Sequence, residues 1–321
     1  MHERLIWVRM VRVPVKFRTA TAPCSTANLG PGYDVFGLAL DALEDKVSIS
    51  KVSPGSSKIS IKNSDPTIPA FPESNSAGLV VKSLMRDFSI NDDLEIRVTK
   101  GVPAGYGIGS SAASAAAAAI AFNALYNLKI DRSRLVEYAA EGEIASAGTK
   151  HYDNVSASLL GGFVIGSGGH FIKFKPPKDL LLVVAVPISM KVPEKKTEVA
   201  RSVLPKEVPL KSVVHNVSAA ATVVAGFALK DVEIIARGID DVVIEPARRH
   251  LIPGYGSVKQ NAISAGALAV TISGAGPSMI AFLNTRKKAN SVAAAMAKGF
   301  ESAGVKSMTF ACRPSSGARL A

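Results

Sequence analysis

One segment constrains the chain more than any other: residues 102–119 read VPAGYGIGSSAASAAAAA. A glycine has no Cβ, so its backbone can adopt positive φ and approach a ligand closely, and successive N–H groups of such a loop form a concave anion site. The alanines that follow favour a helix, and a helix beginning near Ser110 would direct its free N–H groups at the same anion. The segment predicts a phosphate-binding loop that opens into a helix, and its alternating glycines are Gly105, Gly107 and Gly109.

A second interpretation of this segment stays open, namely a glycine turn followed by a capped core helix. Ser110 and Ser111 fit the first helical turn, where a hydroxyl can cap the helix, bind phosphate or reach a magnesium ion. The segment is not a Walker loop, because no Gly-Lys-Ser/Thr follows the glycines. It also lacks the preceding β-α-β context of a dinucleotide fingerprint, which residues 100–103 do not clearly supply.

Composition describes an ordinary globular protein. The chain has 321 residues, 47% of them hydrophobic and 20% charged, which favours two domains over one. The net charge of +12 is spread along the chain, so solvated faces explain it first, attraction of anionic substrates second and nucleic acid third. Cys24 and Cys312 lie far apart and indicate a reducing cytoplasm rather than a disulfide scaffold, and no metal-ligand spacing is present.

Neither an export signal nor a membrane span is expected. Basic residues interrupt every apolar stretch of the first eighteen residues, unlike a signal peptide. The longest apolar runs, 180–188 and 213–229, are too short or too interrupted by polar residues to span about 30 Å of hydrocarbon. We therefore expect a soluble cytoplasmic protein without a membrane partner.

Strands and helices mix along the whole chain. Because they do not alternate strictly, they favour an α+β fold over a doubly wound parallel sheet. Four glycines or serines at 166–169 mark the expected boundary between domains 1–167 and 168–321. The expected strands are 11–21, 46–52, 58–62, 94–99, 161–166, 180–187, 269–272 and 278–283, with a loop over 22–37, and the expected helices are 76–87, 110 onward, 131–147, 213–229, 231–238 and 288–303.

Four other segments are chemically unusual. They are the small, polar stretch 22–34, the stretch 143–154 with a carboxylate, a histidine and an Asp-Asn pair, the segment EPAR at 245–248, and the glycine turn SGAGPS at 273–278. Taken singly, each has a structural explanation. Asn28 and Asp34 can form turns, His151 can be hydrogen-bonded, Glu143 can be solvated, and Arg248 can pair at the surface.

Taken together, in this order and at these separations, the segments resemble the GHMP kinase superfamily, named for galactokinase, homoserine kinase, mevalonate kinase and phosphomevalonate kinase. The most similar branch is the homoserine kinase family, which typically shows SANLGPGFD, then HxDNV leading to LLGG, an HN pair, and EPxR before IPG. Here these motifs stand at 26–34, at 151–155 with 159–162, at 215–216 and at 245–248. The resemblance covers roughly residues 14–310.

The chain departs from the family pattern in small ways. Cys24-Ser25-Thr26 stands where relatives commonly have Ala-Thr-Ser, and Tyr33 stands where they have Phe, and both changes keep size or polarity. About ten extra residues precede the usual start, so the initiator is Met1 or Met10.

The resemblance implies a two-domain α+β fold, with a left-handed β-α-β unit in the N-terminal domain, a ferredoxin-like C-terminal domain and the active site between them. It implies the phosphorylation of the L-homoserine hydroxyl by ATP and Mg²⁺, a step of threonine biosynthesis. Phosphoryl transfer asks the protein mainly for positioning and charge neutralisation. Whether Asp153, Asn154 or no residue serves as the base is left open, as is association into a homodimer.

The resemblance also assigns roles to residues of this chain. For Asn75, an adenine contact and a helix cap are equally open. Magnesium would be held by Ser110 and Glu143, and Asp34 suits the substrate ammonium, whereas Arg201 and Arg248 suit its carboxylate. The expected ATP-binding residues are Asn75, Pro103, Gly105, Gly107, Ile108, Gly109, Ser110, Ser111 and Ala112; the substrate-binding residues are Asn28, Asp34, His151, Arg201, Arg248, Ser273 and Gly274; and the catalytic residues are Ser110, Glu143, Asp153 and Asn154.

Two alternative functions remain, one within the same superfamily and one from a different class of protein. Another GHMP kinase, of the shikimate or mevalonate type, would keep the glycine motifs but use other substrate residues, and the HYDNV and EPAR segments argue against it. An RNA-binding protein is the other alternative, because the N-terminal half of the family resembles ribosomal and elongation-factor domains. Aromatic residues are few and do not interleave with basic ones, which argues against a nucleic-acid partner.

Overall fold

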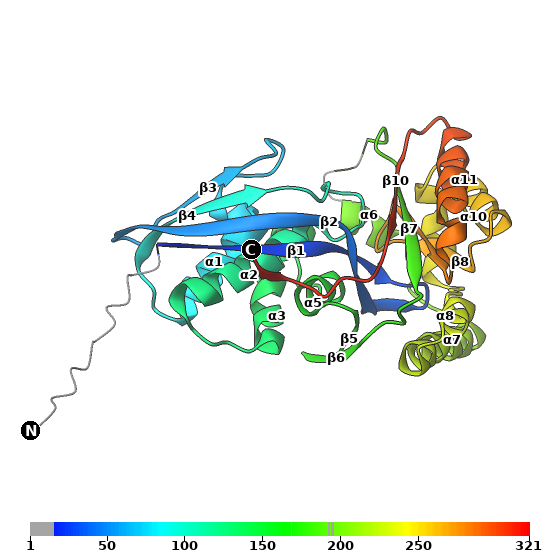
Figure 1. The fold of residues 1–321 in the computed structure, drawn as a ribbon, viewed down its shortest axis with the longest axis horizontal. Coiled ribbons are helices and arrows are strands. Elements are labelled where there is room, and N and C mark those ends of the chain that lie inside the picture. The colour runs from blue at the N-terminus through cyan, green and yellow to red at the C-terminus, as the bar shows by residue number, and fades with distance from the viewer. Residues whose placement is uncertain (1–15, 168, 192, 194–195) are drawn as a thin grey trace, which may run out of the picture.

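The structure, a computed structural model, describes residues 16–321 except 168, 192, 194 and 195. Two β-sheets with helices packed against them organise it (Figure 1). The larger sheet has the order β11-β1-β2-β4-β3, and β5 and β6 extend it from β2. Its strands are β1 (Phe17–Asn28), β2 (Gly32–Pro54), β3 (Ile59–Asn63), β4 (Asp92–Thr99), β5 (Phe163–Ser167), β6 (His170–Phe174) and β11 (Arg319–Leu320).

Helices cover one face of this larger sheet (Figure 1). β3 and β4 are parallel and are joined through η1 (Pro72–Ser74) and α1 (Ser76–Asp87), which makes them a β-α-β unit. The central helix is α2 (Ser110–Tyr126), and every alanine from 112 to 119 is buried. Such small side chains let a helix lie close to its neighbours on all sides. Beside it lie α3 (Arg132–Glu141), α4 (Ile144–Ala147) and α5 (Asp153–Leu160).

The smaller sheet has the antiparallel order β10-β7-β9-β8, which is 4-1-3-2 in chain order, the pattern of a ferredoxin-like fold. Its strands are β7 (Leu181–Val186), β8 (Ala269–Ile272), β9 (Met279–Leu283) and β10 (Met308–Cys312). The helices of this half are α6 (Lys196–Ser202), α7 (Leu210–Leu229), α8 (Val232–Gly238), α9 (Ile244–Arg248), η2 (Arg249–Leu251), α10 (Tyr255–Ser264), η3 (Arg286–Lys288) and α11 (Ala289–Glu301).

The alternating side chains of β7 separate two hydrophobic cores. Leu182 and Val184 face a core that also contains Phe36, Leu38 and Phe163 of the larger sheet. The intervening side chains face a second core, formed with α10 and α11. The smaller sheet is therefore packed on both faces, and one of these faces joins the two halves of the molecule.

Two elements differ from the sequence-based expectation. The loop expected over 22–37 shrinks to residues 29–31, because the small side chains at 24–27 are buried and pair with β2 at 37–40. The helix expected over 131–147 is broken, since α3 ends at Glu141 and α4 begins at Ile144. A side chain at Gly142 would lie 2.8 Å from Ser76 O, so the chain turns there in close contact with α1.

The strand expected over 11–21 begins at Phe17, and its residues 11–15, like Met1 and Met10, lie outside the described residues. The domain boundary expected between 167 and 168 falls inside the β5–β6 hairpin, and both strands belong to the larger sheet. The chain also returns to this sheet at its end, where β11 pairs with β1. The exact division of the domains stays a prediction.

Helix α7 has an unusual surface. It is 20 residues long with a mean hydropathy of 1.5, so that length and composition alone would let it cross a membrane, contrary to the expectation for residues 213–229. Its inner face nevertheless belongs to the fold. Phe227 stacks on Phe163 of β5 with ring centroids 3.9 Å apart, and Val223 lies in the core that joins the two halves. His215 and Asn216 bond to Asp240 and Asp241.

Candidate active site

A cavity of about 640 Å³ lies between the two halves, large enough for a nucleotide or another small molecule. Both halves contribute to its lining. Of the residues expected to bind ATP or substrate or to act in catalysis, those that line it are Asn28, Asp34, Asn75, Gly105, Gly107, Gly109, Ser110, Ser111, Glu143, His151, Asp153, Asn154, Arg201, Arg248 and Gly274. Pro103, Ile108, Ala112 and Ser273 are not among its lining residues.

The glycine loop has the expected conformation. Gly105, Gly107 and Gly109 all have positive φ, of 87°, 79° and 69°, and α2 begins directly after them. Ser110 donates its hydroxyl to Val102 O at 2.7 Å, which closes the loop across its base. The free N–H groups at the start of α2 thus face a cavity, which is the arrangement that favours an anion.

A loop of the second half is clamped against this glycine loop. A Cβ on Gly107 would lie 2.4 Å from Gly276 O and 2.5 Å from Ser273 O, so only glycine fits. Ser273 donates its hydroxyl to Gly107 O at 2.8 Å, and its oxygen accepts the hydroxyl of Thr26, with the two oxygens 2.9 Å apart. Ser273 is one of the expected substrate-binding residues, but it is fully buried and ties the two loops together.

The same loop also contacts the first motif. Asn28 donates its amide to Gly274 O at 2.8 Å, and Gly274 N donates to Ala27 O at 3.2 Å. Asn28 Oδ1 accepts the backbone N–H of Asp34 at 3.1 Å, and this bond helps to orient the Asp34 carboxylate. Three segments far apart in the sequence, around residues 28, 107 and 274, therefore form one rigid junction at the edge of the cavity.

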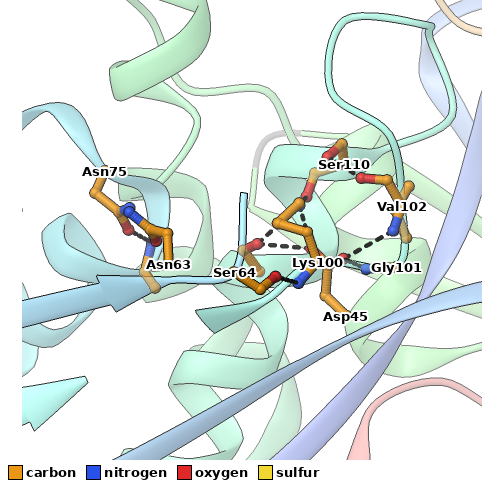
Figure 2. Close-up of polar contacts among 10 residues, drawn as sticks. Asp45, Asn63, Ser64, Asn75, Lys100, Gly101, Val102 and Ser110 are labelled. Atoms are coloured by element: carbon orange, nitrogen blue, oxygen red, sulfur yellow. Dashed lines mark hydrogen bonds and ion pairs between the residues drawn. The ribbon is translucent and has the colours of Figure 1, made fainter. Parts of the chain in front are cut away.

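A buried carboxylate fixes both ends of the glycine loop. Asp45 Oδ1 accepts the N–H groups of Gly101 and Val102, each at 3.0 Å, and Oδ2 accepts the hydroxyl of Ser114 at 2.6 Å. Asp45 also forms an ion pair with Lys100 (Figure 2). Sequence reasoning missed this group, because Asp45 lies about sixty residues before the loop in an ordinary strand pattern.

Asn75 is a helix cap. Its Oδ1 accepts the N–H groups of Ala77 and Gly78, at 3.0 and 3.2 Å. Its Nδ2 donates to Pro69 O at 2.7 Å and to Asn63 Oδ1 at 3.4 Å (Figure 2). Both amide hydrogens and both acceptor positions are thus used within the protein. Of the two interpretations left open, the geometry favours the cap, and an adenine contact through this side chain would have to break it.

Glu143 lies in the break between α3 and α4 and is buried. Burial raises its pKa to about 7, Asp153 adds to the rise, and a hydrogen bond with Ser111 opposes it. Within residues 16–321, apart from the four that are not described, no group of three or more His, Cys, Asp or Glu side chains could hold a metal ion. The position suits a cation that takes one or two protein ligands and completes its shell with phosphate oxygens and water, as Mg²⁺ does.

Charged side chains from both halves face each other across the other part of the cavity. Arg201 donates to both oxygens of Asp34, at 2.9 and 2.7 Å. Arg248 is buried and donates to Ala200 O and Gly274 O, at 2.9 and 3.3 Å. Both guanidinium groups lie over the ring of Tyr33, at 5.5 and 5.1 Å from its centroid. This part of the cavity can bind a small molecule that carries both a positive and a negative group.

His151, Asp153 and Asn154 connect the two parts. Asp153 is buried at the start of α5, which raises its pKa to about 6, and Asp34 adds to the rise. Asn154 Oδ1 accepts the hydroxyl of Ser25 at 3.0 Å and would lie 3.2 Å from a Cβ on Gly109, so it contacts the glycine loop. His151 is half-buried, and burial lowers its pKa.

Two family models match the chain. The one described as GHMP kinases N terminal domain matches residues 75–162, and the one described as GHMP kinases C terminal matches residues 223–302. Together with the cavity and its glycine loop, they define a GHMP kinase. The superfamily and the two-domain α+β fold predicted from the sequence are confirmed.

Individual relatives identify the family within this superfamily. A homoserine kinase of Thermoplasma volcanium is 40% identical over 294 residues, which cover 90% of this chain and 92% of that protein. The crystal structure of a homoserine kinase from Cytophaga hutchinsonii has a TM-score of 0.89 at 32% identity and covers 95% of this chain and 98% of that one. The mevalonate kinase of L. major, at 15% identity and a TM-score of 0.70, shares the fold alone. The chain belongs to the homoserine kinase family of the GHMP kinases.

The junction at Gly107 yields a prediction. Replacing Gly107 by Ala should raise KM for ATP about tenfold or more, because the new methyl group would displace the glycine loop or the 273–278 loop. Gly304→Ala is the matched control, since Gly304 has nearly the same φ, 74° against 79°, and an added Cβ would meet no atom within 4 Å. Steady-state kinetics and thermal unfolding of both variants test this. Equal KM values for ATP in the two variants would show that the contact does not shape the nucleotide site.

Proposed function

We propose that the protein transfers the γ-phosphoryl group of ATP to the side-chain hydroxyl of L-homoserine. The hydroxyl oxygen forms the new P–O bond, the bond between the β-γ bridging oxygen and the γ-phosphorus breaks, ADP leaves, and the hydroxyl proton is released. The observation that carries the proposal is one cavity with an anion-binding glycine loop in one part and the Asp34, Arg201 and Arg248 charges in the other. The family supports the same reaction.

The ionic groups of the cavity suit an α-amino acid. Asp34 and Arg201 neutralise each other as an ion pair that is still about a third exposed. An amino acid carries both an ammonium and a carboxylate, so it can take Asp34 and Arg201 as new partners without leaving either uncompensated. Arg248 adds a second cation for the carboxylate, in the geometry that permits paired hydrogen bonds.

Magnesium fits the other part of the cavity. Ser110 and Glu143 would hold it, and it would supply a divalent charge that neutralises the charge of the phosphate groups. Glu143 supports this assignment because a buried carboxylate with a raised pKa is stabilised by a nearby divalent cation. Glu143 would then act through the metal, and Ser110 would orient both the metal and the glycine loop through its bond to Val102 O.

A substrate panel tests the proposed function. Purified protein should phosphorylate L-homoserine in the presence of ATP and Mg²⁺, and activity should be lost when EDTA removes the metal. Shikimate and mevalonate lack the paired ammonium and carboxylate, so they should give rates at the background level in the same coupled ADP-release assay. Turnover of shikimate or mevalonate without turnover of homoserine would contradict the proposal, and salt-sensitive RNA retention without saturable ATP binding would favour the RNA-binding alternative.

Substrate positioning should matter more than proton abstraction, because a loose transition state needs little help from a base. Arg248→Ala should lower kcat/KM for L-homoserine roughly 30-fold or more, which corresponds to about 2–5 kcal/mol for truncating a buried charged partner. Asp153→Asn, which keeps the size of a buried side chain, should cost less. An inactive Asp153→Asn variant beside a nearly normal Arg248→Ala variant would identify Asp153 as the base and contradict this order.

We further propose that the protein works in the cytoplasm as a homodimer, without a membrane or nucleic-acid partner. Both cysteines are buried free thiols, which suits a reducing compartment. The exposed face of α7 supports the dimer, because residues at 210, 214, 217, 221, 225 and 228 share one face of the helix and are all apolar and exposed. Of these six positions, the three in the first half of the helix are Leu210, Val214 and Val217, and the three in the second half are alanines. Two antiparallel copies would therefore pack large side chains against small ones.

The dimer can be tested on α7. Val214→Glu should convert the dimer to a monomer in analytical ultracentrifugation, since a charge would be buried at the helix contact. Val52→Glu is the control, because Val52 is exposed to a similar extent on β2, 65% against 62%. A wild-type protein that sediments as a monomer, or that floats with lipid vesicles, would contradict the dimer and favour another partner for this face.

A further inference from the structure

Of the lysines that the structure describes, two line the cavity, and the surroundings of these two differ. Lys100 lies at the end of β4, and its ammonium donates to three acceptors, namely the carboxylate of Asp45, Ser110 O at 3.0 Å and Ser114 Oγ at 3.1 Å (Figure 2). An ammonium group has three N–H donors. Lys100 therefore has no donor left for a ligand, and it serves to hold the glycine loop.

Lys196, the first residue of α6, is placed differently. Its ammonium donates to Gly276 O at 2.6 Å, and this is the one acceptor recorded for it among the described residues. Two of its N–H donors are therefore available to a ligand in the cavity, which Lys196 lines. Sequence reasoning did not select Lys196, because it follows a run of charged residues that looks like a solvated surface.

The acceptor of Lys196 locates its ammonium beside the glycine loop. Gly276 O is the atom closest to the point where Gly107 would carry a Cβ, at 2.4 Å. The carbonyl oxygen of Gly276 therefore lies between the Lys196 ammonium and Gly107, which is in the middle of the anion-binding loop. Lys196, in the second half of the molecule, and Gly107, in the first, both line the cavity.

The charges around Lys196 place it between the two parts of the cavity. Its ammonium interacts electrostatically with Glu143, in the part assigned to the metal, and with Arg248, in the part assigned to the amino acid. The phosphoryl group has to pass between these parts. Burial and, after it, the charge of Arg248 lower the pKa of Lys196 to about 7.

We propose that Lys196 is a catalytic residue that binds the γ-phosphoryl group of the nucleotide and neutralises its charge during transfer. This rests on the proposed function, because it takes ATP as the phosphoryl donor. In a loose transition state the charge spreads over three equatorial oxygens of the moving group. The glycine loop can contact those oxygens from one side, and Lys196 supplies a cation from the other, where Gly276 holds it in place.

The nucleotide itself provides the sharpest test, because ADP lacks the γ-phosphoryl group. Lys196→Met should bind a non-hydrolysable ATP analogue about tenfold or more weakly by calorimetry, while its affinity for ADP stays within about twofold. Its kcat should fall about 10²–10³-fold, as for the loss of one transition-state donor. Lys196→Arg keeps the charge and should recover part of both. Lys206→Met, at an exposed lysine after α6, should match the wild type.

Three other outcomes would overturn the proposal for Lys196, and each can be distinguished from failure of the proposed function. Equal weakening of ADP and of the analogue would mean that Lys196 only supports the fold. A rise in KM for L-homoserine alone would make it an amino-acid ligand. A Lys196→Arg variant that binds the analogue fully but is as inactive as Lys196→Met would make Lys196 a base. Wild-type protein that binds neither nucleotide would instead contradict the proposed function.

Discussion

The site depends on the insertion of the 273–278 loop between two segments of the other half of the molecule. Ser273 and Gly274 bond to Gly107 O, Thr26 and Ala27, and the contact at Gly107 leaves no room for a side chain. This loop is held by β8 and β9, so the smaller sheet sets its position. The same contact aligns the glycine loop, the carboxylate of Asp34 through Asn28, and the ammonium of Lys196 through Gly276. Both parts of the cavity are thus built on one junction.

A second constraint keeps the glycine loop open for a ligand. Gly105, Gly107 and Gly109 can adopt many backbone conformations in a free chain, so a single loop conformation has to be held from outside. The network of Asp45, Lys100 and Ser114 fixes the loop at both ends. The buried alanines of α2 make this possible, because they let the helix lie deep in the first half with its N-terminus at the cavity. Preorganised donors are the main contribution that a protein can make to phosphoryl transfer.

The sequence predicted the parts of the site whose chemistry is local. The glycine loop and the start of α2 carry their own signals, because backbone conformation and helix propensity depend on neighbouring residues. The EPAR segment was selected only through its resemblance to the family. The sequence did not predict Asp45, Lys100 or Lys196, whose partners are distant in sequence. The same limit explains the loop expected over 22–37, since pairing with β2 and burial, rather than local composition, extend β1 to Asn28. Asn75 shows that a family motif can carry a structural cap.

One junction positions an amino acid and a nucleotide for direct phosphoryl transfer. A crystal structure with L-homoserine, Mg²⁺ and a non-hydrolysable ATP analogue tests it most directly. The account predicts the α-ammonium on Asp34, the carboxylate on Arg248 with Arg201 released from Asp34, and the γ-phosphoryl group between the glycine loop and the ammonium of Lys196. An intact Asp34–Arg201 pair with the amino acid bound elsewhere, or a γ-phosphoryl group directed away from Lys196, would contradict it.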